Sequence, residues 1–172
     1  MEELHIFDNQ SKRKDLSTKS LLKLERDDLF AFSRKYLNKS DPLYKLVENV
    51  KPEDGYEDFV IHGQPDFVEY ETTNGQWIQL TASEYAEALQ NDIEYHGGNI
   101  RLLAYKSGML NDGFAQQLAN ILHVKVKAPT QTLWINENGD TFITDSQILA
   151  DMWDSGETVK ATGIWKVFLP RE

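Results

Sequence analysis

The chain has 172 residues, 40% of them apolar, with 18 basic against 28 acidic side chains and a formal net charge of −10. This length suits one domain with a small appendage, and the apolar content, with four tryptophans and eight phenylalanines, excludes wholesale disorder. The absence of cysteine excludes disulfides, cysteine-ligated zinc and a thiol nucleophile. An acidic surface repels phosphate backbones, and no apolar run approaches the roughly 18 residues of a membrane span. We therefore predict a soluble domain with no nucleic-acid partner and no membrane span.

Charge divides the chain into two parts. Residues 1–52 hold 11 basic and 9 acidic side chains, a net of +2, whereas residues 53–172 hold 7 and 19, a net of −12. The change falls in residues 51–55, Lys-Pro-Glu-Asp-Gly, a composition typical of a linker. Apolar residues recur at helical spacing between residues 21 and 47. We predict a helical N-terminal arm over 1–52, either a layer of the domain or a linker inherited from a longer polypeptide, and an α/β domain over 53–172.

The first half of the acidic part predicts a strand, a hairpin and a helix. The strand covers 59–61, and the hairpin strands at 67–71 and 76–80 flank an Asn-Gly dipeptide, which favours a type I′ turn. Thr81 and Glu84 form a capping box that begins the helix. Alternating acids in a hairpin usually mark its solvated face. We therefore expect the carboxylates of this hairpin, Asp66, Glu69 and Glu71, to be exposed.

The second half continues to alternate between strand and helix patterns. The predicted elements are a strand at 100–104, a helix at 114–122, a strand at 124–128, a hairpin of 133–136 with 141–144, a short helix at 148–153 and a last strand at 164–168. Strands that alternate with helices favour a parallel sheet with right-handed crossovers and helices on its faces. We predict an α/β fold of three layers, with a mainly parallel central sheet and the hairpins as antiparallel strands at its edges.

Ligands of open parallel sheets gather at the carboxyl ends of the strands. Three predicted strand ends carry polar residues, namely His62-Gly63, Tyr105 to Gly108, and Pro129-Thr130. If the three strands are neighbours, these loops share one rim.

The same residues carry a resemblance to a known family. After His62-Gly63 come Ile100–Leu103 and Ser107-Gly108. The motifs that follow in order are Ala-Gln-Gln-Leu-Ala at 115–119, Val-Lys-Ala-Pro-Thr at 126–130, Trp to Gly at 134–139 and Trp-Lys-Val-Phe at 165–168. Over about residues 56–169 the chain resembles a C-terminal domain of bacterial polymorphic toxins joined to LXG or Rhs delivery regions. That family has the His-Gly and Ser-Cys arrangement of caspase-like (clan CD) cysteine peptidases, so the resemblance implies a caspase-like α/β domain.

One departure from the family pattern decides the expected chemistry. Where the family has Ser-Cys, this chain has Ala104-Tyr105. In a His/Cys dyad the thiolate attacks a carbonyl carbon while the histidine transfers protons. A tyrosine phenol, with a pKa near 10, is a poor substitute. His62 therefore matches the family position, and cysteine-peptidase activity is not expected.

Four residues are candidates for a divergent site, each with a structural alternative. His62 and Tyr105 are the candidate catalytic residues; the alternatives are a hydrogen-bonded histidine at a strand end and a tyrosine that fills the volume of a lost site. Ser107 and Thr130 are candidate binding residues, and Ser107 is also a possible hydroxyl nucleophile beside His62. The four histidines are scattered without metal-ligand spacing, so we predict no metal and no cofactor.

Two functions from different classes remain open. The first is a toxin-type effector domain of a bacterial polymorphic toxin system, delivered into a competing cell as the end of a larger secreted protein. The second is a non-enzymatic pseudo-enzyme, cytoplasmic and bacterial, that binds a protein partner as an immunity-type or decoy protein. A cognate toxin or immunity protein is the expected partner in either case. A third hypothesis is a hydrolase or transferase that uses His62 with a nearby carboxylate. The acidity either keeps the domain soluble or complements a basic partner.

Overall fold

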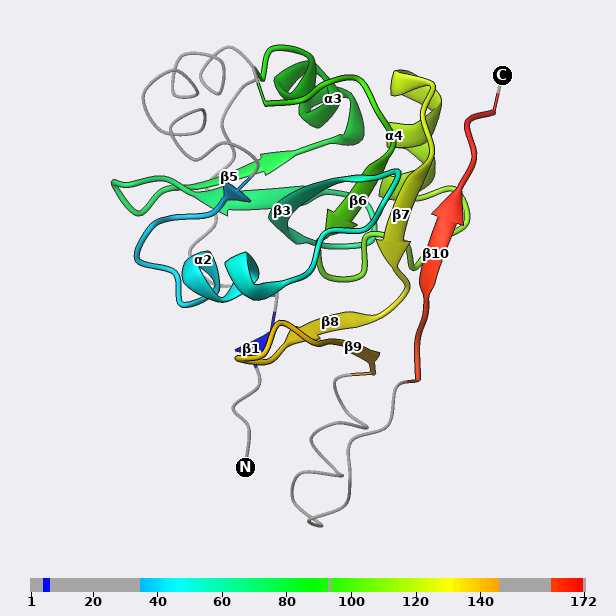
Figure 1. Cartoon of the computed structure of the whole chain (residues 1–172). Coiled ribbons are helices and arrows are strands. Elements are labelled where there is room, and N and C mark those ends of the chain that lie inside the picture. The colour runs from blue at the N-terminus through cyan, green and yellow to red at the C-terminus, as the bar shows by residue number, and fades with distance from the viewer. Residues whose placement is uncertain (1–4, 7–34, 93, 146–161, 172) are drawn as a thin grey trace.

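The computed structural model describes residues 5–6, 35–92, 94–145 and 162–171. Its main element is a mixed sheet with the strand order β10-β7-β6-β3-β4-β5, to which β2 is added along β3 (Figure 1). The fold is therefore α/β with a sheet at its centre, as the alternation of patterns predicts. Most of the predicted arm and the short helix predicted at 148–153 lie outside the described residues.

Three parallel strands form the middle of this sheet. They are β3 (Glu57–Gly63), β6 (Ile100–Leu103) and β7 (Val126–Pro129), with β6 between the other two. The helix α4 (Phe114–Leu122) connects β6 to β7, and α3 (Ala82–Gln90) precedes β6. The capping box of α3 forms as predicted, since Thr81 accepts from the Glu84 amide and Glu84 accepts from the Thr81 amide.

Antiparallel strands complete both edges of the sheet. The hairpin of β4 (Val68–Glu71) and β5 (Trp77–Leu80) forms one edge as predicted, and β10 (Trp165–Phe168) forms the other edge beside β7. The second hairpin differs from the prediction. Its strands β8 (Thr132–Ile135) and β9 (Thr141–Thr144) pair with β1 (His5–Ile6) in a separate three-stranded sheet. Strand pattern predicts that a hairpin forms but not which sheet it joins, because that depends on the faces that are left to cover.

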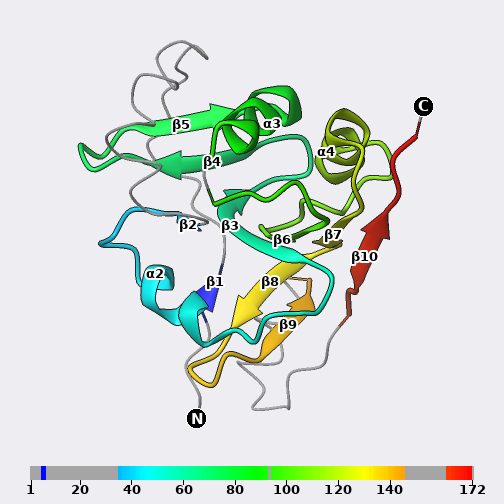
Figure 2. The same ribbon diagram turned by 45° about the horizontal axis from the view of Figure 1, so that its top comes forward.

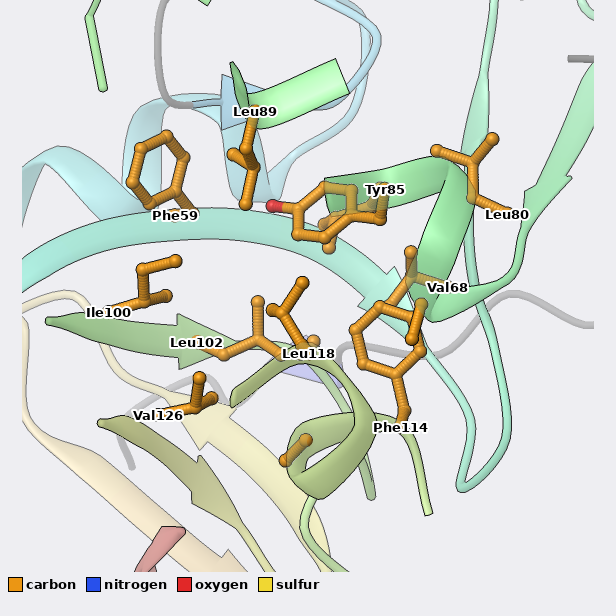
Figure 3. Packing of buried hydrophobic residues seen from close by; sticks show 14 of the residues in the cluster. Phe59, Val68, Leu80, Tyr85, Leu89, Ile100, Leu102, Phe114, Leu118 and Val126 are labelled. Carbon is orange, nitrogen blue, oxygen red and sulfur yellow. The ribbon is translucent and has the colours of Figure 1, made fainter. Parts of the chain in front are cut away.

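The two faces of the main sheet bury different clusters. On one face, α3 and α4 pack against Phe59, Leu102 and Val126 (Figure 3). On the other face, Val60, Leu103 and Tyr105 pack against the second sheet and the segment 37–47. Both Figure 1 and Figure 2 place α2 next to β1 and β8, on the face opposite α3 and α4. Because adjacent residues of a strand point to opposite faces, Phe59 and Val60 belong to different clusters.

The described part of the N-terminal segment supplies a strand and a short helix. The helical spacing continues through Tyr36, yet Lys35–Tyr36 forms β2, parallel to β3. After it come α2 (Leu43–Leu46) and the 3₁₀-helix η3 (Val47–Asn49). Tyr36 is fully buried, and its hydroxyl donates to Asp92 at 2.5 Å. Burial and hydrogen bonding at the sheet thus override local helical periodicity at this point.

The turn of the first hairpin is not the predicted type I′. A type I′ turn needs positive φ at both central residues. Here Gly75 has φ +79°, while Asn74 is not in the left-handed region. The Gly75 amide donates to the Thr72 carbonyl at 2.9 Å, and the Thr72 side chain accepts from the Gln76 amide at 3.1 Å. Because the backbone carbonyl and the side chain of Thr72 accept these two hydrogen bonds, the chain reverses direction over more residues than a two-residue turn would use.

Two tyrosines make stability sensitive to alkaline pH. Burial, with a smaller effect of the Asp92 charge, raises the pKa of Tyr85 well above its usual value of 10. Burial and then Glu57 raise the pKa of Tyr95 to about 12. The unfolded chain therefore loses these protons first, so their contribution to stability is complete below pH 10 and is lost as pH rises from 10 through 12. We expect the free energy of unfolding in urea to fall across this window, and to fall less in Tyr85→Phe. An identical fall in both proteins would contradict the assignment to Tyr85.

Candidate functional site

The three predicted loops share one rim. The parallel neighbours β3, β6 and β7 end at the same edge of the sheet. A Cβ atom on Gly63 would lie 2.7 Å from the Tyr105 carbonyl oxygen, so the ends of β3 and β6 touch through their backbones. The Gly108 amide donates to the Pro129 carbonyl at 2.9 Å, which joins the second loop to the third. The geometric expectation for the rim is thus met.

His62 is held by a carboxylate that the sequence does not single out. Its Nε2 lies 2.7 Å from Asp41 Oδ2, and since a carboxylate only accepts, Nε2 carries the proton. The imidazole is 3% exposed and meets the Trp77 ring edge to face at 5.5 Å. A histidine oriented by a carboxylate is two thirds of a catalytic triad, and the same pair is also a common way to satisfy a buried histidine.

Asp41 does two tasks with one side chain. Its Oδ1 accepts from the Leu43 amide at 2.9 Å, which shapes the start of α2, and its Oδ2 contacts His62. In the sequence, Asp41 lies in the segment whose apolar spacing predicts a helical arm. No local signal connects Asp41 with a histidine 21 residues later.

A second carboxylate lies on the same face as His62. Glu69 is directly opposite His62 in the β3–β4 register, and opposed residues of antiparallel strands have their Cβ atoms about 5 Å apart. Glu69 is fully buried, so the expectation of a solvated face is wrong at this position. Asp66 is exposed and Glu71 is half-buried. The expectation failed because the period of two identifies a face of the hairpin but not whether another part of the chain covers it.

Tyr105 lies in the core of the protein. It is 3% exposed and packs in the cluster that contains Val60 and Leu103. The Lys106 ammonium lies 4.9 Å from the centre of its ring, a distance suited to a cation–π contact. Position 105 is therefore occupied by a packed aromatic ring.

The two candidate binding residues make backbone contacts. Ser107 is fully buried, and its hydroxyl donates its single proton to the Ala104 carbonyl at 2.8 Å. Thr130 Oγ1 accepts from the Ile164 amide at 3.0 Å, and the Thr130 amide donates to the Ile164 carbonyl. Ser107 thus closes the turn after β6, and Thr130 attaches the start of β10 to the end of β7.

This geometry predicts a modest structural effect for Ser107→Ala. The substitution removes one buried hydrogen bond, and we expect the free energy of unfolding to drop by about 1 kcal/mol. Urea denaturation of the two proteins measures the change. Unaltered stability would contradict the assigned role of the hydroxyl.

A polar network occupies the opposite end of β6. Arg101 donates to both oxygens of Asp58 at 2.7 Å and to the Lys51 carbonyl at 2.8 Å. Glu53 approaches Arg101 and also binds Lys127. A hollow of about 220 Å³ adjoins Arg101 and Lys51 and reaches the β8–β9 hairpin at Asn138–Thr141. The Arg101 guanidinium thus donates to acceptors of this chain, so the main role of the network is to hold residues 51–58 against the sheet.

The described residues lack two further features. None of the described helices has the length and apolarity to cross a membrane. Within the same residues, histidines and carboxylates form no group of three or more placed to hold a metal ion.

Comparison with protein families identifies a family to which the chain belongs. A family model described as a domain of unknown function, DUF8616, matches residues 32–143, which is more than half of the chain. The chain belongs to the DUF8616 family. The region matched by the DUF8616 model contains Asp41, His62, Tyr105, Ser107 and Thr130, and it ends before β10. No curated protein and no solved structure matches the chain.

Proposed function

We propose that this protein is a non-catalytic domain of a bacterial polymorphic toxin system that binds a protein partner. The proposal combines the ordered motifs of residues 56–169, which resemble toxin domains with a caspase-like arrangement, with the state of the rim. In the resembling family a cysteine follows the strand next to His-Gly. Here that position is a buried tyrosine, and this single observation carries the proposal.

The contacts of Ser107 and His62 support the proposal that the domain is non-catalytic. A replacement nucleophile needs a hydroxyl that gives its proton to His62 and an opening for a substrate. The Ser107 hydroxyl gives its proton to the Ala104 carbonyl and is fully buried. His62 itself is 3% exposed, and its Nε2 proton is directed at Asp41. The Ser107 hydroxyl proton and the His62 Nε2 proton are thus both engaged by acceptors within the protein.

A first experiment compares growth of bacteria that express the whole chain, His62→Ala or Tyr105→Phe in the cytoplasm. We expect no arrest from any of the three. The tagged chain, purified from the cell that makes it, is expected to carry a protein partner in a fixed stoichiometric ratio. Arrest by the parent chain that His62→Ala relieves, or purification without a partner, would overturn the proposal.

The His62–Asp41 pair favours a second candidate, a toxin-type effector with altered chemistry. A carboxylate at 2.7 Å orients the imidazole, which is the role of the acid in a Ser-His-Asp triad. The substitution Asp41→Asn discriminates between the two functions. It keeps an acceptor oxygen for His62 but removes the charge, so a structural pair tolerates it whereas an acid–base pair loses most of its activity.

A further inference from the structure

Among the described residues, the outer side of β10 is an open sheet edge. Strand β10 is the last in the order of the main sheet, and no strand among the described residues pairs with its outer side (Figure 1). It pairs with β7 in the register Trp165↔Pro129 to Phe168↔Val126. An unprotected edge presents free N–H and C=O groups to any extended chain.

The hydrogen-bond pattern shows which groups of β10 are free. The Thr130 amide donates to the Ile164 carbonyl, so this pair is bonded. Antiparallel ladders alternate between bonded and non-bonded pairs, which directs the amides of Lys166 and Phe168 toward β7 as well. The backbone groups of Trp165 and Val167 then point outward. The Pro129–Trp165 pair is accordingly a non-bonded pair, because the Pro129 carbonyl points to the other side of β7 and accepts from the Gly108 amide there.

Apolar side chains accompany this edge. Val167 is 42% exposed, Leu169 is 58% exposed and Ile164 is 63% exposed. These three make up half of the large apolar side chains that are exposed among the described residues, the others being Met109, Leu110 and Ile121. Exposed apolar residues on an open edge are typical of a strand that pairs with another chain.

The charges around β10 indicate which kind of partner segment would pair with it. Residues 53–100, which form β3, β4, β5 and α3, contain no lysine or arginine. The six described basic residues of 53–172 all lie on β6, β7 or β10 or in the segments adjoining them. Three of these, Arg101, Lys127 and Arg171, are paired with carboxylates. The positive charges that remain for a partner, among the described residues, are those of Lys106, Lys125 and Lys166. Lys166 donates to the neutral amide of Asn111, so its charge is not cancelled by that contact. A second copy of β10 would bring like charges together, whereas an acidic segment would find opposite charges.

We propose that β10 is a docking strand that pairs, through the outward backbone groups of Trp165 and Val167, with an extended acidic and apolar segment of a partner protein. The pairing adds a strand to the main sheet and places the partner's alternate apolar side chains against Val167 and Leu169. This inference rests on the proposed function, since it names the surface that the protein partner uses.

A synthetic ten-residue peptide of alternating valine and glutamate, labelled for fluorescence anisotropy, tests the edge. We expect it to bind the full chain and to shift the amide resonances of Trp165 and Val167. Its valine–lysine counterpart is expected to bind at least about tenfold more weakly. Val167→Pro removes an outward N–H and leaves the bonded pairs with β7, so it is expected to weaken binding at least about tenfold, while Val167→Thr keeps the N–H and changes affinity by less than about threefold.

Several outcomes would overturn the inference. The first is that the valine–glutamate peptide does not bind. The second is that Val167→Pro, with its fold intact by circular dichroism, binds the peptide as well as the parent chain does. The third is that the chain forms a dimer that Val167→Pro dissociates, which would identify a second copy as the occupant. The proposed function fails separately. If the natural partner still copurifies with Val167→Pro, partner binding stands and β10 is not its surface; if the peptide binds but no partner copurifies with the parent chain, the edge stands and the proposed function fails.

Discussion

Gly139→Ala is expected to lower the free energy of unfolding by about 3 kcal/mol, through left-handed backbone strain and steric overlap together. Gly139 has φ +82°, and a Cβ atom there would lie 1.8 Å from the carbonyl oxygen of Asn49. Because the blocking atom belongs to the backbone, no rotamer change relieves the overlap. Either the β8–β9 hairpin or the end of η3 has to move, and the hydrogen bond from the Asn49 side-chain Nδ2 to the Glu137 carbonyl is lost with it.

The chain contains a matched control for this substitution. Gly75 occupies the same position in the other Asn-Gly hairpin and has φ +79°, but no atom lies within 4 Å of its added Cβ. Gly75→Ala therefore carries only the backbone strain, about 1 kcal/mol. Urea denaturation of both variants isolates the contact with Asn49. Equal losses in the two variants would contradict the close packing of η3 against the hairpin.

Tyr105→Ala is expected to lower the free energy of unfolding by about 4 kcal/mol, the usual cost of deleting a large buried aromatic side chain. Tyr105 is 3% exposed and lies where the main sheet, the second sheet and the segment 37–47 meet. Its loss leaves a cavity between elements that are distant in sequence. Thermal and urea unfolding monitored by circular dichroism measure the effect.

Tyr105→Phe separates packing from chemistry at the same position. It keeps the ring and removes the hydroxyl, so we expect a loss of about 1 kcal/mol or less. If Tyr105 is a packing residue, the partner that copurifies with the parent chain also copurifies with Tyr105→Phe. A stable Tyr105→Phe protein that loses an activity of the parent chain would instead make the hydroxyl a catalytic group.

The site shows what pattern and topology rules can predict. The parallel order of three strands follows from the strand–helix alternation, and the shared rim follows from that order, so the loops that follow β3, β6 and β7 lie at one edge of the sheet as expected. The role of each side chain does not follow. Asp41 contacts His62 from a segment that the sequence assigns only to a helical arm, and Glu69 is buried on a face that its spacing marks as solvated.

By itself, the sequence determined the properties that are local or summed over the chain. These include the charge difference between the two parts, the absence of a thiol, the capping box at Thr81 and the alternation that produces an α/β sheet. The tertiary structure decided the rest: β2 in place of a helix at Tyr36, a separate sheet for the second hairpin, and Tyr105 as core. The physical reason is that strand pairing and burial depend on contacts between residues far apart in the chain, whereas propensity and spacing report only on neighbours.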